Sequence, residues 1–313
     1  MMHFSSNPMV PACRQAKRKP SFWAQIGIFF LIFLITTLAT ALLAAIPTVF
    51  LMIADPGIHP ETLLASPTMT LVSLFLTVIT TGGALIYCLC IEKRSALSMG
   101  FRKGTFWRSY SKGFLIGTGL LLLCCGLGYV LGGFTVSSVM TLTPAYGVLF
   151  LLGFVIQGSS EEILLRGYFM MSLSNRCRTA WAVGISSVVF SLLHIANPGF
   201  GLLPFINISL FGMFMGLYVY REGDLWGACA IHSAWNFVQG NILGVQVSGT
   251  GTLPTIWQFQ PIEGKTLISG GTFGIEASII VTVVLLATIA ITCSNVSSRN
   301  ADTNGKLKTE NGK

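Results

Sequence analysis

Charged residues are scarce in this chain of 313 residues: Asp, Glu, Lys and Arg together account for 10%, against 52% for hydrophobic residues. A typical soluble domain carries about 25% charged residues, because its surface faces water. The shortage excludes an ordinary soluble domain and indicates a surface that mostly faces lipid. Uncharged stretches of roughly 20 residues or more recur, and each can cross a bilayer core of about 30 Å as a helix.

Three other patterns are missing. The eight cysteines form no CxxC pair and lie mostly inside apolar stretches, so we expect no disulfide framework. The sequence shows no internal repeat, which disfavours a transporter, because transporter spans are commonly arranged as inverted or parallel repeats. It also lacks an HExxH helix, in which two zinc-binding histidines and a base share one face.

Two of the uncharged stretches are too long for a single span. Stretch 113–160 contains a turn signal at Gly132-Gly133, and stretch 179–220 contains one at Asn197-Pro198-Gly199. The other stretches are 22–54, 63–91, 225–261 and 277–293. Together they predict an all-α, polytopic membrane bundle with about eight transmembrane helices.

Lys and Arg gather in alternate connections of this predicted bundle, namely 14–19, 93–112, 176–178, 221 and the tail after 293. The intervening loops carry Asp55, Glu61, Glu263 and Glu276 against a single Lys265. This asymmetry predicts an integral multi-pass protein, of the cell membrane if prokaryotic, with both termini in the cytoplasm. It also explains the net charge of +8, so we expect the lipid bilayer and no nucleic acid as a partner. The first stretch exceeds a signal peptide's apolar core of about 7–15 residues, which favours a membrane anchor.

Ionisable side chains inside the predicted spans mark a candidate site, because each costs about 2.5–3.5 kcal/mol to insert. Glu161, Glu162 and Arg166 lie in one apolar helix predicted over 148–173. Glu162 and Arg166 share a helix face, whereas Glu161 projects about 140° away from Arg166. We therefore expect Glu162 to pair with Arg166 and Glu161 to act as a base toward water. The alternative is an ion cluster that joins helices.

Two histidines lie in other predicted spans. His232 and Asn236 are four residues apart on one helix face, so both could donate hydrogen bonds to one small volume, as in an oxyanion hole. Alternatively, His232 could be an interhelical hydrogen-bonding residue and His194 a helix-end residue near the interface. At 1.5 Å per residue, the two glutamates, His194 and Asn236 lie about 18–24 Å from the nearest basic or acidic loop, and His232 about 12 Å.

Three motifs resemble those of one family. They are Glu161-Glu162-x-x-x-Arg166-Gly167, Phe190-x-x-x-His194 and His232-x-x-x-Asn236, in that order. With the segment 205–237, they resemble the CAAX protease and bacteriocin-processing family of intramembrane endopeptidases, also called CPBP or Abi, which includes the type II CAAX prenyl endopeptidases. The resemblance covers roughly 145–245. Leu165 departs from it, since many members have an aromatic residue there.

The resemblance implies an all-helical membrane protease in which Glu161 activates water and His194 helps to position it. His232 and Asn236 would stabilise the oxyanion, and Glu162 completes the catalytic set. The implied substrate is a membrane-associated protein or peptide, prenylated or bacteriocin-like. A non-catalytic immunity or membrane scaffolding protein of the same family is the alternative. A serine protease using Ser159 or Ser160 is disfavoured, because neither lies in a nucleophile elbow.

A metal is the remaining question, since the family is commonly labelled metalloprotease. Glu161, His194 and His232 could supply a zinc site with water as the fourth ligand. Asn236 is a poor zinc ligand and a good amide donor, which fits an oxyanion hole better. We favour glutamate-activated water without an obligatory cofactor, and zinc stays the possible divalent metal.

We divide the chain into four parts. Residues 1–140 hold N-terminal helices and a basic cytoplasmic loop, and 141–250 hold the protease core with its three motifs. Residues 251–293 form an outer loop and the last span. Residues 294–313 form a disordered cytoplasmic tail, because that segment is rich in polar residues such as Asn and Lys.

Overall fold

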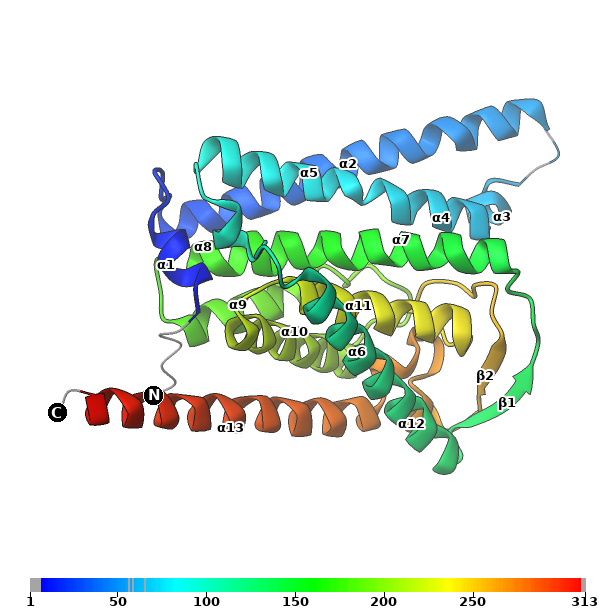
Figure 1. Cartoon of the computed structure of the whole chain (residues 1–313). Coiled ribbons are helices and arrows are strands. Elements are labelled where there is room, and N and C mark those ends of the chain that lie inside the picture. Colours follow the sequence, from blue (N-terminus) through cyan, green and yellow to red (C-terminus); the bar gives the residue numbers. More distant parts are fainter. Residues whose placement is uncertain (1–6, 56, 58, 65, 311–313) are drawn as a thin grey trace.

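The computed structural model describes residues 7–310 except 56, 58 and 65, with side chains described as far as Ser294. The fold is a bundle of helices with a small two-stranded sheet at one end (Figure 1). Its helices are α1 (Met9–Arg14), α2 (Phe22–Ala54), α3 (Pro60–Leu64), α4 (Pro67–Leu76), α5 (Val78–Ile86), α6 (Phe106–Val130), α7 (Pro144–Glu162), α8 (Met171–Leu173), α9 (Thr179–Leu192), α10 (Leu202–Glu222), α11 (Trp226–Phe237), α12 (Thr266–Ser269) and α13 (Ile279–Glu310).

Three of these helices continue as π-helical segments. The segment Tyr87–Ile91 extends α5, Ile163–Met170 joins α7 to α8, and Val238–Ile242 extends α11. Because of the second of these, one unbroken rod runs from Pro144 to Leu173. That rod carries the predicted Glu161, Glu162 and Arg166, and it begins four residues before the helix that the sequence predicted.

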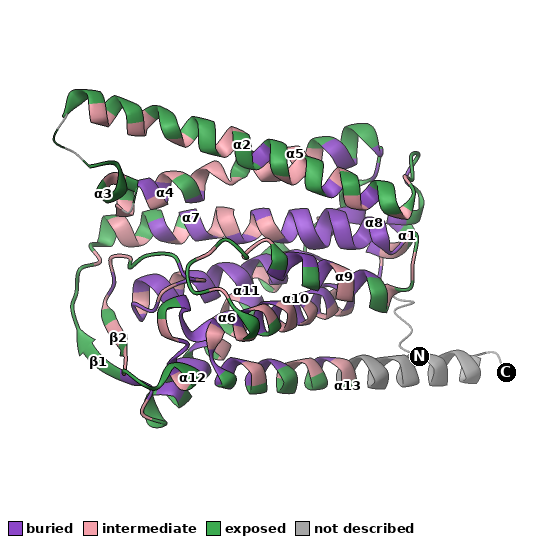
Figure 2. Ribbon diagram, turned by 180° about the vertical axis from the view of Figure 1, so that it is seen from behind, coloured by how far each residue is buried: buried purple, intermediate pink, exposed green. Residues whose placement is uncertain are grey.

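The helices are arranged in layers. In Figure 1, α2 crosses α5 and lies above α4, α7 runs beneath them, and α6, α9, α10 and α11 follow below. Helix α13 forms the lowest layer and packs on α10. Figure 2 shows that burial is concentrated in α7, α8 and α11, whereas α2 is largely exposed. A mainly exposed apolar helix is the pattern expected of a segment that faces lipid.

Five helical segments are long and apolar enough to cross a membrane: Phe22–Ala54, Pro67–Ile91, Phe106–Val130, Pro144–Leu173 and Leu202–Glu222. The apolar helices Thr179–Leu192 and Ile279–Ser294 are shorter. An integral, multi-pass, all-α protein is therefore confirmed, while the number eight and the orientation of the termini stay predictions. Both predicted breaks are confirmed: α6 ends at Val130 before Gly132-Gly133, and α9 and α10 flank the Asn197-Pro198-Gly199 turn.

Close packing of α11 between two neighbours depends on glycine. A Cβ atom on Gly113 or Gly117 of α6 would lie 2.2 or 2.4 Å from the carbonyl oxygen of Gly227 or Ile231 in α11. On the other side, a Cβ atom on Gly158 of α7 would lie 2.9 Å from the backbone nitrogen of Ser233. Small residues four apart allow two membrane helices to bring their backbones together. These glycines thus fix the depth and rotation of α11.

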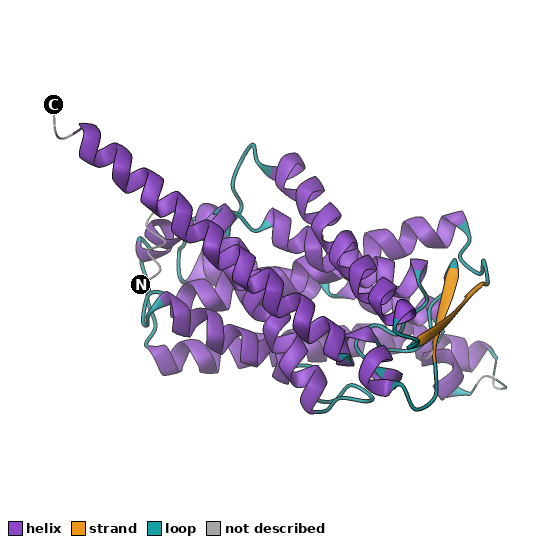
Figure 3. Ribbon diagram, turned by 90° about the horizontal axis from the view of Figure 1, so that it is seen from below, coloured by secondary structure: helices purple, strands orange, loops and turns teal. Residues whose placement is uncertain are grey.

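Two features differ from the sequence prediction. Strands β1 (Phe134–Ser138) and β2 (Trp257–Pro261) pair antiparallel, with Phe134 opposite Pro261 and Ser138 opposite Trp257 (Figure 3). Each strand has only five residues, too few for a clear alternation in an apolar sequence. The backbone is also helical to Glu310, where the sequence predicted a disordered tail from residue 294. No proline follows Ile279, so nothing forces the last helix to stop at the end of its apolar part.

A buried polar cluster ties α2 to the rod that contains α7. The Glu92 carboxylate accepts hydrogen bonds from Gln25 at 2.5 Å and Tyr87 at 3.2 Å, and forms a 3.3 Å ion pair with Arg94. Arg94 also donates to Ser172 at 2.7 Å. The sequence assigned Arg94 to a basic loop, but its side chain is fully buried. Its charge is therefore structural and adds nothing to the basic surface.

Candidate functional site

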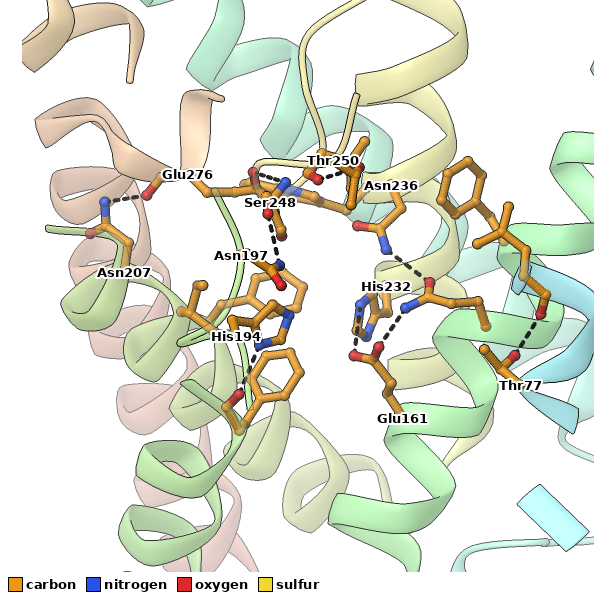
Figure 4. A pocket seen from close by; sticks show the side chains of 18 of the residues that line it. Thr77, Glu161, His194, Asn197, Asn207, His232, Asn236, Ser248, Thr250 and Glu276 are labelled. Carbon is orange, nitrogen blue, oxygen red and sulfur yellow. Dashed lines mark hydrogen bonds and ion pairs between the residues drawn. The ribbon is translucent and has the colours of Figure 1, made fainter. Parts of the chain in front are cut away.

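A cavity in the middle of the bundle brings the predicted site residues together. It is lined by side chains from α4, α7, α9, α10, α11 and α13 and by the loop 247–253. Figure 4 shows Glu161 and His232 on one wall of this cavity, Asn236 above them and His194 on the facing wall. Helix α7 supplies Glu161, α11 supplies His232 and Asn236, and the turn after α9 supplies His194.

The two adjacent glutamates have different surroundings. The Glu161 side chain is 31% exposed and lines the cavity, whereas Glu162 is completely buried and does not. Glu162 Oε1 lies 2.9 Å from Arg166 Nη1, so the predicted pair of residues four apart is present. An ionised carboxylate that is paired in the interior offers little to a substrate, since its charge is already balanced. Glu161 is therefore the carboxylate that can meet a ligand.

His232 connects the two carboxylates. Its Nδ1 lies 2.9 Å from Glu162 Oε1, and its Nε2 lies 3.7 Å from Glu161 Oε2. Because the paired Glu162 can only accept a hydrogen bond, Nδ1 is the donor, and Nε2 is left facing Glu161. The sequence placed His232 shallower than the other site residues. In the structure its ring lies beside both glutamates, a neighbourhood that counting residues from a loop could not show.

Aromatic rings hold this charged group in place. Phe190 and Phe211 contact the His232 ring edge-on, with centroids 5.9 and 5.6 Å away. The Arg166 guanidinium lies over the Phe190 ring, 4.6 Å from its centroid. A cation over an aromatic face is stabilised by the ring's electrostatic field, most strongly when water is excluded. Phe190, the first residue of the Phe190-x-x-x-His194 motif, thus supports both Arg166 and His232.

Asn236 contacts Glu161 through a residue that the sequence reasoning missed. The Asn236 amide Nδ2 donates to Gln157 Oε1 at 3.0 Å, and Gln157 Nε2 donates to Glu161 Oε1 at 2.6 Å. Gln157 lies one helical turn before Glu161 on α7, so its position four residues earlier was the available signal. Gln157 was missed because only charged side chains were considered, and its amide is neutral.

His194 is separate from this group. Its Nδ1 lies 2.9 Å from the carbonyl oxygen of Phe190. A carbonyl only accepts, so Nδ1 is the donor and Nε2 of the neutral ring is an acceptor. His194 lines the cavity on the wall opposite Glu161. It can therefore accept a hydrogen bond from a molecule held between the two walls.

A second polar group closes the cavity at the other end. Glu276 accepts hydrogen bonds from Gln239 at 2.8 Å, from the Ser248 backbone at 2.9 Å and from the Ser248 hydroxyl at 3.0 Å. Asn197 donates to the Ser248 carbonyl at 2.8 Å. Burial raises the pKa of Glu276, which lies before α13 begins, and the donated hydrogen bonds oppose the rise. The sequence placed Glu276 in a loop before the last span, and the structure adds that its side chain is buried and holds the loop over the cavity.

The three residues proposed as zinc ligands do not converge. Within the described part of the chain, no group of three or more His, Cys, Asp and Glu side chains has the arrangement needed to hold a metal ion. Glu161 and His232 are neighbours, but His194 lies on the facing wall. A tetrahedral zinc site needs ligand atoms about 2.0–2.2 Å from one point. In this conformation the donor set does not fit a catalytic zinc.

Comparison with known proteins identifies a family for the central part of the chain. Residues 143–238, about a third of the sequence, match the family model described as "Type II CAAX prenyl endopeptidase Rce1-like". The matched segment contains Glu161, Glu162, His194, His232 and Asn236. The resemblance to the CAAX protease family is thereby confirmed over this central segment. No curated protein matches the chain.

Proposed function

We propose that this protein is an intramembrane endopeptidase in which Glu161 activates the water that hydrolyses a peptide bond. The observation that supports it most strongly is the contrast between two adjacent carboxylates. Glu162 is buried with Arg166 and His232, whereas Glu161 is partly exposed to a cavity shared with His194 and Asn236. Two titratable groups in different environments are the usual sign of separate catalytic and supporting roles.

The proposed reaction is built from the atoms that face the cavity. Glu161 takes a proton from a water molecule, and the resulting hydroxide attacks the carbonyl carbon of the scissile bond. His194 Nε2 accepts the other water proton as a hydrogen bond and orients the attack. The second N–H of the Asn236 amide and the Nε2–H of a protonated His232 stabilise the oxyanion. Protonated Glu161 then gives its proton to the leaving amine, so the carboxylate is regenerated.

Glu162 and Arg166 support this reaction without touching substrate. Glu162 holds His232 through Nδ1 and so fixes which nitrogen faces the cavity, as the carboxylate does in other carboxylate–histidine pairs. Arg166 balances the charge of the buried Glu162 carboxylate by pairing with it.

The substrate we propose is the tail of a membrane-associated protein or peptide, for example one that carries a prenylated cysteine. Apolar side chains from four helices line the cavity beside the polar groups, among them Leu74, Phe154, Phe211 and Leu285. Such a lining suits an apolar or lipid-modified chain, because the few polar groups then set its orientation. The family description names prenylated CAAX substrates, which agrees with this lining.

The test compares cells that produce the wild-type protein with cells that produce Glu161→Gln. Mass spectrometry of membrane peptides should find cleavage products that disappear in the variant, while the amount of inserted protein stays equal. Glu222→Gln is the matched control, because Glu222 pairs with exposed Lys112 away from the cavity. Identical peptides from wild type and Glu161→Gln would refute proteolysis and favour an immunity or scaffolding role.

The role of metal is tested on purified protein that cleaves a verified product. Elemental analysis and activity after chelation are measured in parallel. We expect activity to persist in chelator with far less than one zinc per chain. About one zinc per chain, lost together with activity and restored by zinc, would overturn this proposal and make His194 and His232 ligands.

A further inference from the structure

Among the described residues, Gln157 is the side chain that joins the proposed base to the proposed oxyanion donor. Its Nε2 donates to Glu161 Oε1 at 2.6 Å and its Oε1 accepts from Asn236 Nδ2 at 3.0 Å. Among the described residues, no other side chain hydrogen bonds to either of these two groups. Gln157 lines the cavity itself. The contact also crosslinks α7 to α11 at the depth of the site.

The donor and acceptor roles in these two hydrogen bonds fix the orientation of both amide groups. An ionised carboxylate has no proton to donate, so Glu161 forces Gln157 to turn its NH₂ group toward it. The Gln157 carbonyl oxygen must then face Asn236, and it can only accept. Asn236 is consequently forced to turn its NH₂ group, and not its carbonyl oxygen, toward Gln157. The charge on Glu161 thus determines, through Gln157, which way round the Asn236 amide is held.

We propose that Gln157 is a positioning residue that orients both the Glu161 carboxylate and the Asn236 amide for the reaction. This inference rests on the proposed function, because it assigns Glu161 and Asn236 their catalytic tasks. Without its bond to Gln157 the Asn236 amide is free to rotate, so its second N–H is no longer held in one direction for the oxyanion. Loss of Gln157 should therefore slow the chemical step more than it weakens substrate binding.

Two substitutions separate positioning from simple packing. Gln157→Met keeps the length of the side chain and removes both hydrogen bonds. Gln157→Glu is the conservative variant: when protonated, its hydroxyl donates to Glu161 and its carbonyl accepts from Asn236, so both bonds return. When ionised, it can only accept and it repels Glu161. Gln25→Met is the matched control, because Gln25 makes a similar bond to Glu92 in the polar cluster away from the cavity.

The kinetic test uses an internally quenched peptide that ends in a farnesylated Cys-aliphatic-aliphatic-X sequence. For Gln157→Met we expect kcat to fall about 10- to 100-fold with KM within about threefold of wild type. For Gln157→Glu we expect activity near wild type at acidic pH and a steep loss as pH rises. Gln25→Met should keep the wild-type kcat for each folded molecule. Gln157→Glu with the wild-type pH profile would overturn the proposal.

A spectroscopic test decides the question even if the wild type does not cleave this peptide. The infrared band of the Glu161 carboxyl group is isolated in each protein by subtracting the spectrum of the same protein that also carries Glu161→Gln. We expect this band to shift in Gln157→Met, which loses the 2.6 Å hydrogen bond, and to stay in place in Gln25→Met. An unshifted band in Gln157→Met would refute the positioning role, whereas an inactive wild type with a shifted band would refute only the proposed substrate.

Discussion

The glycine contacts of α11 give a prediction with a magnitude taken from the structure. An alanine at position 117 would place its Cβ atom 2.4 Å from the carbonyl oxygen of Ile231, where ordinary contacts begin at 3.4 Å. Helix α11 must then move by about 1 Å, since two backbones meet there and neither has a flexible side chain to yield. His232 comes directly after Ile231, so the shift reaches the site.

We expect Gly117→Ala to lower stability by about 1–3 kcal/mol, as overpacking does in other cores. We also expect cleavage to fall by about 100-fold, because a 1 Å error in a catalytic group has an effect of that size. Gly119→Ala is the control on the same helix, since no atom lies within 4 Å of its added Cβ. Gly158→Ala, with a closest approach of 2.9 Å, should give a smaller defect.

The assays are thermal unfolding of the purified protein in detergent and cleavage of the verified peptide per folded molecule. The control variant should unfold at or slightly above the wild-type temperature, because alanine favours a helix more than glycine does. If Gly117→Ala matched Gly119→Ala in both assays, α11 would not be held by backbone contact, and the explanation given for the position of His232 would be wrong.

Three other predictions each concern a single residue. Arg166→Ala should destabilise the protein by about 3–5 kcal/mol in thermal unfolding, because Glu162 is left buried and unpaired, and wild-type unfolding in this variant would show that the pair is dispensable. The pKa of Glu276 is raised in the folded state, which therefore holds the proton more tightly than the unfolded state does. The contribution of Glu276 to stability is full below its ordinary pKa of 4.5 and is lost as pH rises toward the raised value. Glu276→Gln should flatten the dependence of the unfolding free energy on pH, and an unchanged dependence would exclude Glu276 as its source. Glu61→Cys should react with a membrane-impermeant thiol reagent only from the outer side, and labelling only from the cytoplasm would reverse the proposed topology.

The sequence predicted those features that depend on nearest neighbours along one helix. The Glu162–Arg166 pair is expected from a spacing of four residues, and both helix breaks are expected from glycine and proline in turns. The position of His232 relative to Glu161 could not be predicted, because it depends on how closely α11 approaches α6 and α7. The burial of Glu276 could not be predicted for a similar reason: its partners Gln239 and Ser248 lie 37 and 28 residues earlier in the chain, and a single charge in a loop carries no sign of such contacts.

The π-helical segment Ile163–Met170 changes the direction in which side chains project from the two ends of the long central rod. A π-helical turn accommodates an additional residue compared with an α-helical turn, so it resets the angle between the helix before it and the helix after it. Glu161 precedes the segment and lines the cavity, whereas Ser172 comes after it and binds Arg94 in the separate polar cluster. Removing one residue from the segment would rotate one end against the other by about 100°. The rod can therefore serve two unrelated polar groups at once, because the angle between them is set by the irregular turns and not by the spacing of a straight helix.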